Sequence, residues 1–263
     1  MVMEKFCGTR LCKNTSNIQD GKTNTMKLGI MQPYFLPYIG YWQLLNAVDK
    51  YVIYDDVNFI KGGWINRNRI LVNGQPKYFN VPMIGASSFK LINEVEVNQN
   101  SKLIQNNLRI LESAYKKAPY YSQICPLMER ILNNKSINLA KYVTESIRVI
   151  CEYLSIKTEL VMSSELDKDC SLRGQEKVLS ICRLLKADEY YNAAGGQALY
   201  SFEAFKKQGI NLKFLQTKFT PYEQLGGQFQ QGLSIIDVLM FNSKERIYEL
   251  LNQFSLIESP NDD

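Results

Sequence analysis

The stretch from Met26 to Arg69, MKLGIMQPYFLPYIGYWQLLNAVDKYVIYDDVNFIKGGWINRNR, decides the fold class. It begins with a short apolar run at 28–31, which breaks at Gln32-Pro33 into a loop rich in tyrosine and proline. An apolar segment of helical character follows at 42–48, and a β-rich run at 51–54 ends in two aspartates. Strand, turn, helix and strand in this order predict a βαβ unit.

The alternation continues beyond this unit. Further strands are predicted at 158–162, 189–192 and 212–215. Helices are expected at 102–118, 120–132, 138–154, 174–185, 202–208 and 234–254, the last with Ser234 as its N-cap. Strands that alternate with helices over short links predict an α/β fold with a doubly wound parallel sheet. Asn73-Gly74 predicts the turn of a separate β-hairpin.

The chain divides into two segments of different character. Residues 1–25 are polar and lack apolar periodicity. We expect either a disordered leader or residues upstream of the natural start, and we favour Met26 as the first residue. Residues 26–263 have the apolar content of a single α/β domain, with 102–154 as a helical insertion or lobe. No apolar run reaches the roughly 18 to 20 residues that a membrane span needs.

Histidine is absent from all 263 residues. A Ser-His-Asp triad, a Cys-His dyad, an HExxH zinc site and an imidazole general base are therefore excluded. The six cysteines form no CxxC pair, so we expect no zinc and favour a reducing cytoplasm. The net charge of +5 is spread along the chain, which argues against a nucleic-acid partner. Small anionic ligands and an ordinary solvated surface both remain as interpretations of that charge.

Polar side chains gather where the first two predicted strands end. Because ligands of parallel α/β sheets bind at the carboxyl ends of the strands, we expect these side chains to share one crevice. Asp55 and Asp56 are candidates for a catalytic base or for ligands of Mg²⁺. Lys61 and Arg67 follow them and would supply positive charge. The candidates for substrate contacts are Asn58, Trp64, Asn66 and Asn68.

Several of these features also have structural interpretations. Tyr38 and Tyr41 could pack the first helix on the sheet, and Asp55-Asp56 could cap a turn. Further along, Asn192 with Gly195-Gly196 follows a predicted strand as a phosphate or ribose loop would. A tight strand-to-helix turn explains that last motif equally well.

Three separated motifs resemble the WbqC-like protein family. They are QPYFLPYIGYWQLLNAVDKYVIYDDVNFIKGGWINRNRI at 32–70, YYNAAGGQALY at 190–200 and LSIIDVLMFNS at 233–243. The resemblance extends from Met26 to about Phe254. It implies a bacterial origin and a role in building or tailoring a surface glycan such as an O-antigen.

The start of the first helix is similar, more distantly, to the nucleotidylyltransferase-like superfamily. Tyr38-Ile39-Gly40-Tyr41 occupies the place of the HxGH motif that contacts nucleotide phosphates there, with tyrosine in place of both histidines. Tyrosine carries no positive charge near neutral pH, so cationic help would come from the loop that contains Lys61, Arg67 and Arg69. The resemblance implies a nucleotidylyltransferase-like fold with ATP or another nucleotide, and Mg²⁺, as cofactor. The residues expected to contact the nucleotide are Gln32, Tyr34, Tyr38, Gly40, Tyr41, Asn192, Gly195 and Gly196.

The residues and the resemblances together predict a transferase or ATP-dependent ligase of surface-polysaccharide biosynthesis. It would modify a sugar with an acyl or aminoacyl group and would bind a small nucleotide or nucleotide-sugar. The alternative is a non-catalytic module that binds a nucleotide-sugar or a partner protein. Homo-oligomerisation is left open.

Overall fold

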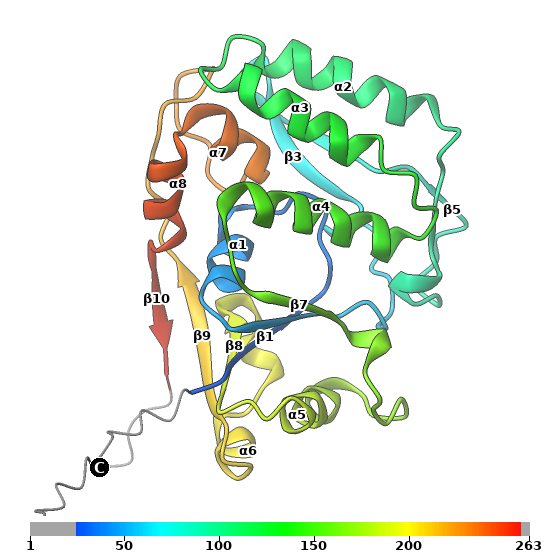
Figure 1. Cartoon of the computed structure of the whole chain (residues 1–263), viewed down its shortest axis with the longest axis vertical. Coiled ribbons are helices and arrows are strands. Elements are labelled where there is room, and N and C mark those ends of the chain that lie inside the picture. The colour runs from blue at the N-terminus through cyan, green and yellow to red at the C-terminus, as the bar shows by residue number, and fades with distance from the viewer. Residues whose placement is uncertain (1–24, 259–263) are drawn as a thin grey trace, which may run out of the picture.

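A six-stranded sheet in the order β10-β9-β8-β1-β2-β7 forms the centre of the molecule (Figure 1). The computed structural model describes residues 25–258. The strands are β1 (Lys27–Met31), β2 (Lys50–Ile53), β7 (Glu159–Met162), β8 (Glu189–Ala193), β9 (Asn211–Thr217) and β10 (Phe254–Ile257). The pairings from β9 through β8, β1 and β2 to β7 are parallel, whereas β10 pairs antiparallel with β9. The prediction of an α/β fold is confirmed, and the predicted parallel sheet is parallel except for the edge strand β10.

Helices cover both faces of this sheet (Figure 1). Side chains alternate between the faces of extended backbone, so Leu28, Ile30 and Val52 pack on one side and Tyr51 and Ile53 on the other. The first side is covered by α5 (Gly174–Leu184) and α6 (Phe202–Lys206). The second is covered by α1 (Ile39–Asn46), α4 (Leu139–Leu154), α7 (Ile235–Phe241) and α8 (Lys244–Leu251).

The strand order reverses between β1 and β8. From β1 the chain proceeds outward to β2 and then β7, and it returns to the other side of β1 with β8 and then β9. Loops that leave the carboxyl ends of β1 and β8 therefore diverge to opposite faces, which leaves a crevice between them. This crevice is where a doubly wound sheet binds its ligands.

The remaining elements lie beyond the carboxyl-end edge of the sheet. The hairpin of β3 (Arg67–Val72) and β4 (Gln75–Asn80) turns at Asn73 and Gly74, whose φ angles are 51° and 72°. Positive φ at both central residues is the geometry that Asn-Gly predicts, so the hairpin prediction is confirmed. The other elements are α2 (Lys102–Tyr115), α3 (Tyr121–Leu132), the strands β5 (Met83–Ile84) and β6 (Glu96–Val97), and the short helices η1 (Ile92–Glu94), η2 (Ser163–Glu165) and η3 (Ala194–Leu199).

The prediction of one helix over 234–254 is wrong. Asn242 is extended, with φ −128° and ψ 144°, and separates α7 from α8, while Ser243 caps α8 by accepting a hydrogen bond from the Arg246 amide. Residues 254–257 form β10, which the sequence did not distinguish from a helix end because a short apolar run suits either. Ser234 caps α7 as predicted, since its hydroxyl accepts a hydrogen bond from the Ile236 amide.

The proposed leader at 1–25 lies outside the described residues, apart from Thr25. Within residues 25–258, none of the helices combines the length and the apolar character needed to cross a membrane. The helices at 102–154 contribute their buried side chains to the same apolar cluster as α1. That cluster holds the wall of the crevice in place.

Candidate functional site

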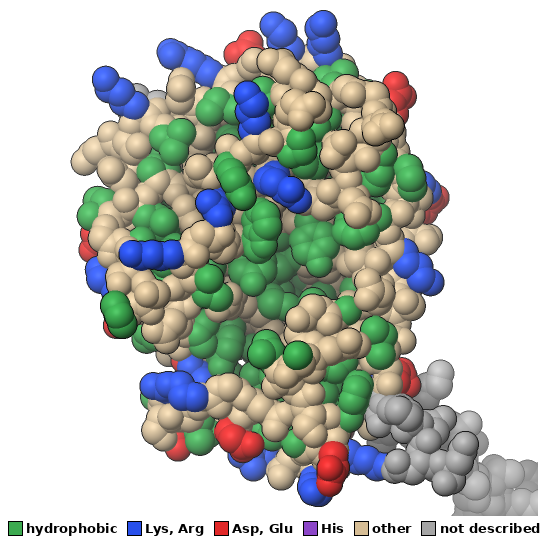
Figure 2. All heavy atoms as spheres, turned by 180° about the vertical axis from the view of Figure 1, so that it is seen from behind, with side chains coloured by type: hydrophobic (Ala, Val, Ile, Leu, Met, Phe, Trp, Pro, Cys, Tyr) green, Lys and Arg blue, Asp and Glu red, His purple; other side chains and the backbone are tan. Residues whose placement is uncertain are grey.

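A cavity of about 560 Å³ occupies the crevice at the carboxyl ends of β1, β2 and β8. We call it the chamber. Its walls come from the loop after β1, the loop after β2, the first residue of α5 and η3. Figure 2 shows that one face of the molecule is hollowed, with mostly hydrophobic side chains inside the hollow. The lining residues are Ile30, Met31, Gln32, Tyr34, Tyr38, Tyr41, Leu44, Tyr54, Val57, Ile60, Gly174, Asn192, Ala193, Gly195, Gly196, Leu199 and Tyr200.

The lining of the chamber is mostly apolar, and its polar groups are uncharged. Gln32 accepts a hydrogen bond from the Tyr34 hydroxyl at 3.4 Å through Oε1, and its carbonyl accepts one from Tyr41 at 3.2 Å. Among the described residues, none accepts a hydrogen bond from Gln32 Nε2, so this donor is available to a ligand. Burial raises the pKa of Tyr34, Tyr38 and Tyr41 above the ordinary phenol value, which keeps all three hydroxyls protonated.

The floor of the chamber at the end of β8 is rigid. Asn192 is buried, and its Nδ2 donates to the Tyr190 hydroxyl at 2.7 Å while its Oδ1 accepts from the Ala193 amide at 2.7 Å. Gly195 has open space where a Cβ would stand, and Gly196 lies against the Asn192 side chain. The predicted phosphate or ribose loop thus lies beside Gln32 and the tyrosines.

A second cavity of about 170 Å³ adjoins the chamber and shares Tyr54, Val57 and Gly174 with it. Asp56 and Lys177 line this cavity. We call it, together with the Lys168–Asp56–Lys177 ion cluster, the cationic annex. The Asp56 carboxylate contacts Lys168 Nζ at 2.9 Å and Lys177 Nζ at 3.0 Å. The lysine side chains are only 2% and 4% exposed. Two buried ammonium groups against one carboxylate leave an excess of one positive charge.

The excess charge is held by carbonyl oxygens rather than by a second acid. Lys177 Nζ donates to the Asp56 carbonyl at 2.8 Å, and Lys168 Nζ donates to the Ser163 carbonyl. Burial opposes ionisation of Asp56, but the Ser163 hydroxyl and the two ammonium groups outweigh it and lower the pKa of this carboxyl. A buried charge is costly unless it is paired, so the annex favours an incoming anion.

Two further features direct positive potential into the annex. The exposed Arg173 lines it and is held by hydrogen bonds from Nη1 to the Cys170 and Leu172 carbonyls. Helix α5 begins at Gly174, whose φ of 53° suits glycine, and its first turn contributes free backbone N–H groups. Helix amino termini attract anions, which supports the ammonium groups of the ion cluster.

The other sequence-predicted residues lie around this site rather than in it. The Asp55 carboxylate accepts hydrogen bonds from the Ser164 amide at 2.9 Å and hydroxyl at 2.6 Å, which fixes η2. Arg67 donates to the Gly62 and Gly63 carbonyls and lies 4.3 Å from the centre of the Tyr78 ring. Lys61 is exposed. Positive charge next to the chamber therefore comes from the annex and not from the 61–67 loop.

Asparagines of the predicted substrate set hold loops. Asn58 Nδ2 donates to the Ser88 carbonyl at 2.8 Å, and Asn66 Nδ2 donates to the Val81 carbonyl at 3.0 Å. Asn58 also lines the annex. Trp64 and Asn68 line a third cavity next to the chamber.

The aspartate pair does not fit a Mg²⁺ site. Asp55 is occupied by Ser164, and both lysines of the annex bind the carboxylate of Asp56. Ammonium groups at 2.9 and 3.0 Å repel a divalent cation from that carboxylate. Within residues 25–258, no group of three or more Cys, Asp or Glu side chains is arranged to hold a metal ion.

Gly40 supports the chamber without lining it. A Cβ at this position would stand 2.2 Å from Thr217 Oγ1 and 2.5 Å from the Tyr38 ring. We therefore expect Gly40→Ala to lower the free energy of unfolding by about 1–3 kcal/mol, the usual cost of overpacking. Urea unfolding measures this. Gly195→Ala is the matched control, because no atom lies within 4 Å of its added Cβ, and an equal loss there would contradict the assignment.

Sequence reasoning missed the cations that matter most. All three lie far along the chain from the first βαβ unit: Lys168 and Arg173 in the connection from β7 to α5, and Lys177 within α5. One signal was present: Lys177 shares a helix face with Gly174 and Ile181, where an apolar residue is expected. A lysine on the buried face of a helix needs a partner.

Two comparisons with known proteins match most of the chain. A family model described as the WbqC-like protein family matches residues 32–249. An uncharacterized protein of Mycobacterium tuberculosis strain H37Rv, Rv1507c, is 28% identical over 218 residues, which cover 82% of this chain and 93% of the relative. No solved structure matches the chain.

Proposed function

This chain belongs to the WbqC-like protein family, and we propose that it is a transferase or ligase of bacterial surface-polysaccharide biosynthesis. Its substrate would be nucleotide-activated, and it would transfer an acyl or aminoacyl group to a sugar. The observation that carries this proposal is the neutral, tyrosine-rich chamber that opens onto the cationic annex. A nucleotide-sugar is divided in the same way into neutral and charged parts, since its base and sugar rings are uncharged and its phosphates are anionic.

The residues of both cavities suit the two halves of such a ligand. In the chamber, tyrosine faces would pack against rings, and Gln32 Nε2 offers an amide donor for a hydrogen bond. In the annex, Lys177, Arg173 and the first turn of α5 would hold phosphate oxygens. Because Tyr54, Val57 and Gly174 border both cavities, one ligand can occupy both.

In this proposal, catalysis depends on alignment of the substrates and on positive charge next to the leaving group. No described residue that lines the chamber is a carboxylate, lysine, arginine or histidine. An acyl transfer would therefore rely on alignment of the two substrates: the acceptor hydroxyl or amine attacks the acyl carbon and the acyl–phosphate bond breaks. The leaving phosphate, stabilised by Lys177 and Arg173, takes up the acceptor's proton. The proposal includes a nucleotidylyltransferase-like fold, a cytoplasmic location and action as a monomer or homo-oligomer.

A thermal-shift screen tests the proposal. Nucleoside mono-, di- and triphosphates and nucleotide-sugars, each with and without Mg²⁺, should include compounds that raise the unfolding temperature, because binding only the folded state stabilises it. Each hit is then incubated with sugar acceptors, and transfer is followed by mass spectrometry. If no phosphate-bearing compound shifts the unfolding temperature, the proposal fails.

The same uncharged lining favours a second candidate function. A chamber without an acid or base suits a non-catalytic module that holds a nucleotide-sugar for a partner enzyme. The two candidates differ in one measurement. Binding together with turnover favours the enzyme, and tight binding without turnover for any acceptor favours the module.

Bound ligand should protect one cysteine from alkylation. Cys170 is exposed and lines the annex, whereas Cys151 and Cys182 are buried and burial raises the pKa of each thiol to about 12. Iodoacetamide should therefore modify Cys170 before these two buried thiols, and a hit from the screen should slow that modification. Peptide mass spectrometry separates Cys170 from Cys125, the partly exposed control. Equal protection of both thiols would indicate a general change of structure instead of occupancy of the annex.

A further inference from the structure

A third cavity, of about 310 Å³, adjoins the chamber and shares no lining residue with the second cavity. It shares Tyr34 and Tyr38 with the chamber, and we call it the aromatic cavity. Its other lining residues are Pro37, Trp64, Asn68, Phe219 and Gly232. Trp64 and Phe219 are 40% and 38% exposed, so these large apolar rings face solvent at the cavity.

The aromatic walls are arranged as platforms. The rings of Tyr38 and Phe219 have centroids 6.2 Å apart and an interplanar angle of 32°, and those of Trp64 and Tyr78 are 6.4 Å apart. Exposed rings of this kind suit a ligand with flat, partly apolar faces and polar edges. A sugar ring has these properties.

A cation without a hydrogen-bond acceptor among the described residues lies beside the aromatic cavity. The Arg69 guanidinium is 5.7 Å from the centre of the Trp64 ring, and Nη2 is 3.9 Å from the point where a Cβ would stand on Gly232. Its Nε is buried without a hydrogen bond. Within residues 25–258, no carboxylate or carbonyl accepts a hydrogen bond from the Arg69 side chain. A half-buried, unpaired guanidinium next to a cavity favours a bidentate anion such as a carboxylate.

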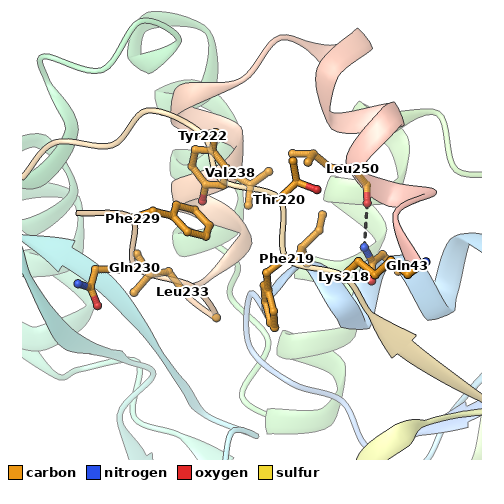
Figure 3. A pocket seen from close by; sticks show the side chains of 12 residues that line it. Gln43, Lys218, Phe219, Thr220, Tyr222, Phe229, Gln230, Leu233, Val238 and Leu250 are labelled. Atoms are coloured by element: carbon orange, nitrogen blue, oxygen red, sulfur yellow. Dashed lines mark hydrogen bonds between the residues drawn. The ribbon is translucent and has the colours of Figure 1, made fainter. Parts of the chain in front are cut away.

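The far wall of this cavity is fixed before any ligand arrives. The loop from Lys218 to Leu233 supplies Phe219, and Figure 3 shows Phe219, Tyr222 and Phe229 on this loop. Tyr222 donates to Asp237 Oδ1 at 2.8 Å, and Gln224 Nε2 donates to the same atom at 2.6 Å. A pocket with preformed walls binds its ligand without the cost of ordering a loop.

The same loop is also held to the β3–β4 hairpin. A Cβ on Gly226 would stand 2.6 Å from the Gly74 Cα, so the two backbones are in direct contact. This contact and the hydrogen bonds to Asp237 attach the loop at two places. The loop therefore holds Phe219 in a fixed position at the cavity.

We propose that the aromatic cavity is the acceptor subsite and that it binds an acidic sugar, with the ring against Trp64 and the carboxylate on Arg69. The assignment rests on the proposed function, because it places the acceptor next to the activated donor in the chamber. Tyr34 and Tyr38 lie at the junction, where the two substrates would meet. The three cavities would then hold the phosphates, the transferred part of the donor and the acceptor in sequence.

Tryptophan fluorescence tests the subsite directly and without a nucleotide. The chain has two tryptophans, and Trp42 is completely buried while Trp64 lies at the cavity. Methyl β-D-glucuronide should change the emission of Trp64 on titration and should bind at least about 10-fold more tightly than methyl β-D-glucoside, as expected for one charged hydrogen-bond pair. Trp64→Phe should remove the signal.

The matched variant is Arg69→Gln, which keeps a polar side chain of similar reach. It should abolish the preference for the glucuronide while calorimetry still detects weak binding of both glycosides. Equal affinity of the parent protein for the two glycosides, or no binding of either, would overturn the proposal. Because no nucleotide is present, such a failure is distinct from a failure of the thermal-shift screen.

Discussion

Replacing Asp56 by alanine should lower the free energy of unfolding by about 3–5 kcal/mol, which is the usual cost of removing one partner from a buried ion pair. The carboxylate contacts two ammonium groups, at 2.9 and 3.0 Å, whose side chains are almost entirely buried. Without it, Lys168 and Lys177 remain buried and close together with no acid between them. Urea unfolding at neutral pH measures the loss.

Two further variants establish the cause of that loss. Asp169→Ala removes an exposed carboxylate nearby, whose contacts are with Ser171 in its own turn, and it should leave the unfolding midpoint unchanged. Combining Asp56→Ala with methionine at both Lys168 and Lys177 should recover most of the stability, because no unpaired charge is then buried. A loss that persists in this triple variant would show that packing, and not charge, explains the effect.

The pH dependence of the parent protein follows from the same carboxyl. Its pKa is lowered in the folded state, so it contributes stability above the ordinary carboxyl pKa of 3.8, and this contribution is lost as the pH falls through the folded-state pKa. Acid unfolding of the parent should therefore be steeper than that of Asp56→Ala. Parallel acid-unfolding curves for the two proteins would contradict this.

Lys177→Met should weaken binding of a phosphate-bearing ligand about 10- to 100-fold, the range expected for a lost hydrogen bond to a charged group. It should do so with little effect on stability, because Lys168 and Asp56 remain as a balanced pair. Methionine also retains the unbranched apolar stem of lysine. Calorimetric titration with a nucleotide or nucleotide-sugar from the screen measures the change.

The control for this variant is Lys207→Met. Lys207 is exposed on the surface after α6, pairs with Glu203 at 2.7 Å, and lines none of the three cavities. Lys207→Met removes the same net charge as Lys177→Met, so any effect of overall charge on binding appears in both variants. Equal affinity of Lys177→Met and the parent would show that the annex does not bind the phosphate.

The sequence allowed the fold class to be predicted because its local signals agree with one another. Apolar runs at 28–31 and 51–54 are too short for helices and end in polar residues, and both became strands of one parallel pair. Asn73-Gly74 fixed the hairpin turn by its backbone preference alone. The prediction for the end of the chain was wrong, because Phe254–Ile257 acquires its conformation from pairing with β9. Local sequence does not encode that contact.

The candidate site divides in the same way. Gln32, Tyr34, Tyr38, Asn192 and Gly195 could be placed together, because the ends of parallel strands share one edge. The source of positive charge could not be predicted, because Lys177 and Lys168 contact Asp56 from more than 100 residues further along the chain. Nearness in sequence pointed to Lys61 and Arg67, but Lys61 is exposed and Arg67 is directed to the 62–63 carbonyls.

The uncharged lining of the chamber has a consequence for its behaviour in solution. Its lining includes no imidazole, thiol or carboxylate, and the hydroxyls of Tyr34, Tyr38 and Tyr41 keep their protons well into the alkaline range. The chamber therefore keeps one ionisation state across the whole neutral range. A terminal phosphate loses its last proton near pH 6. The chamber itself therefore adds no pH dependence to binding between about pH 5 and 8. The part of any change that comes from the ligand's phosphate would be absent for a diester, which has no proton to lose.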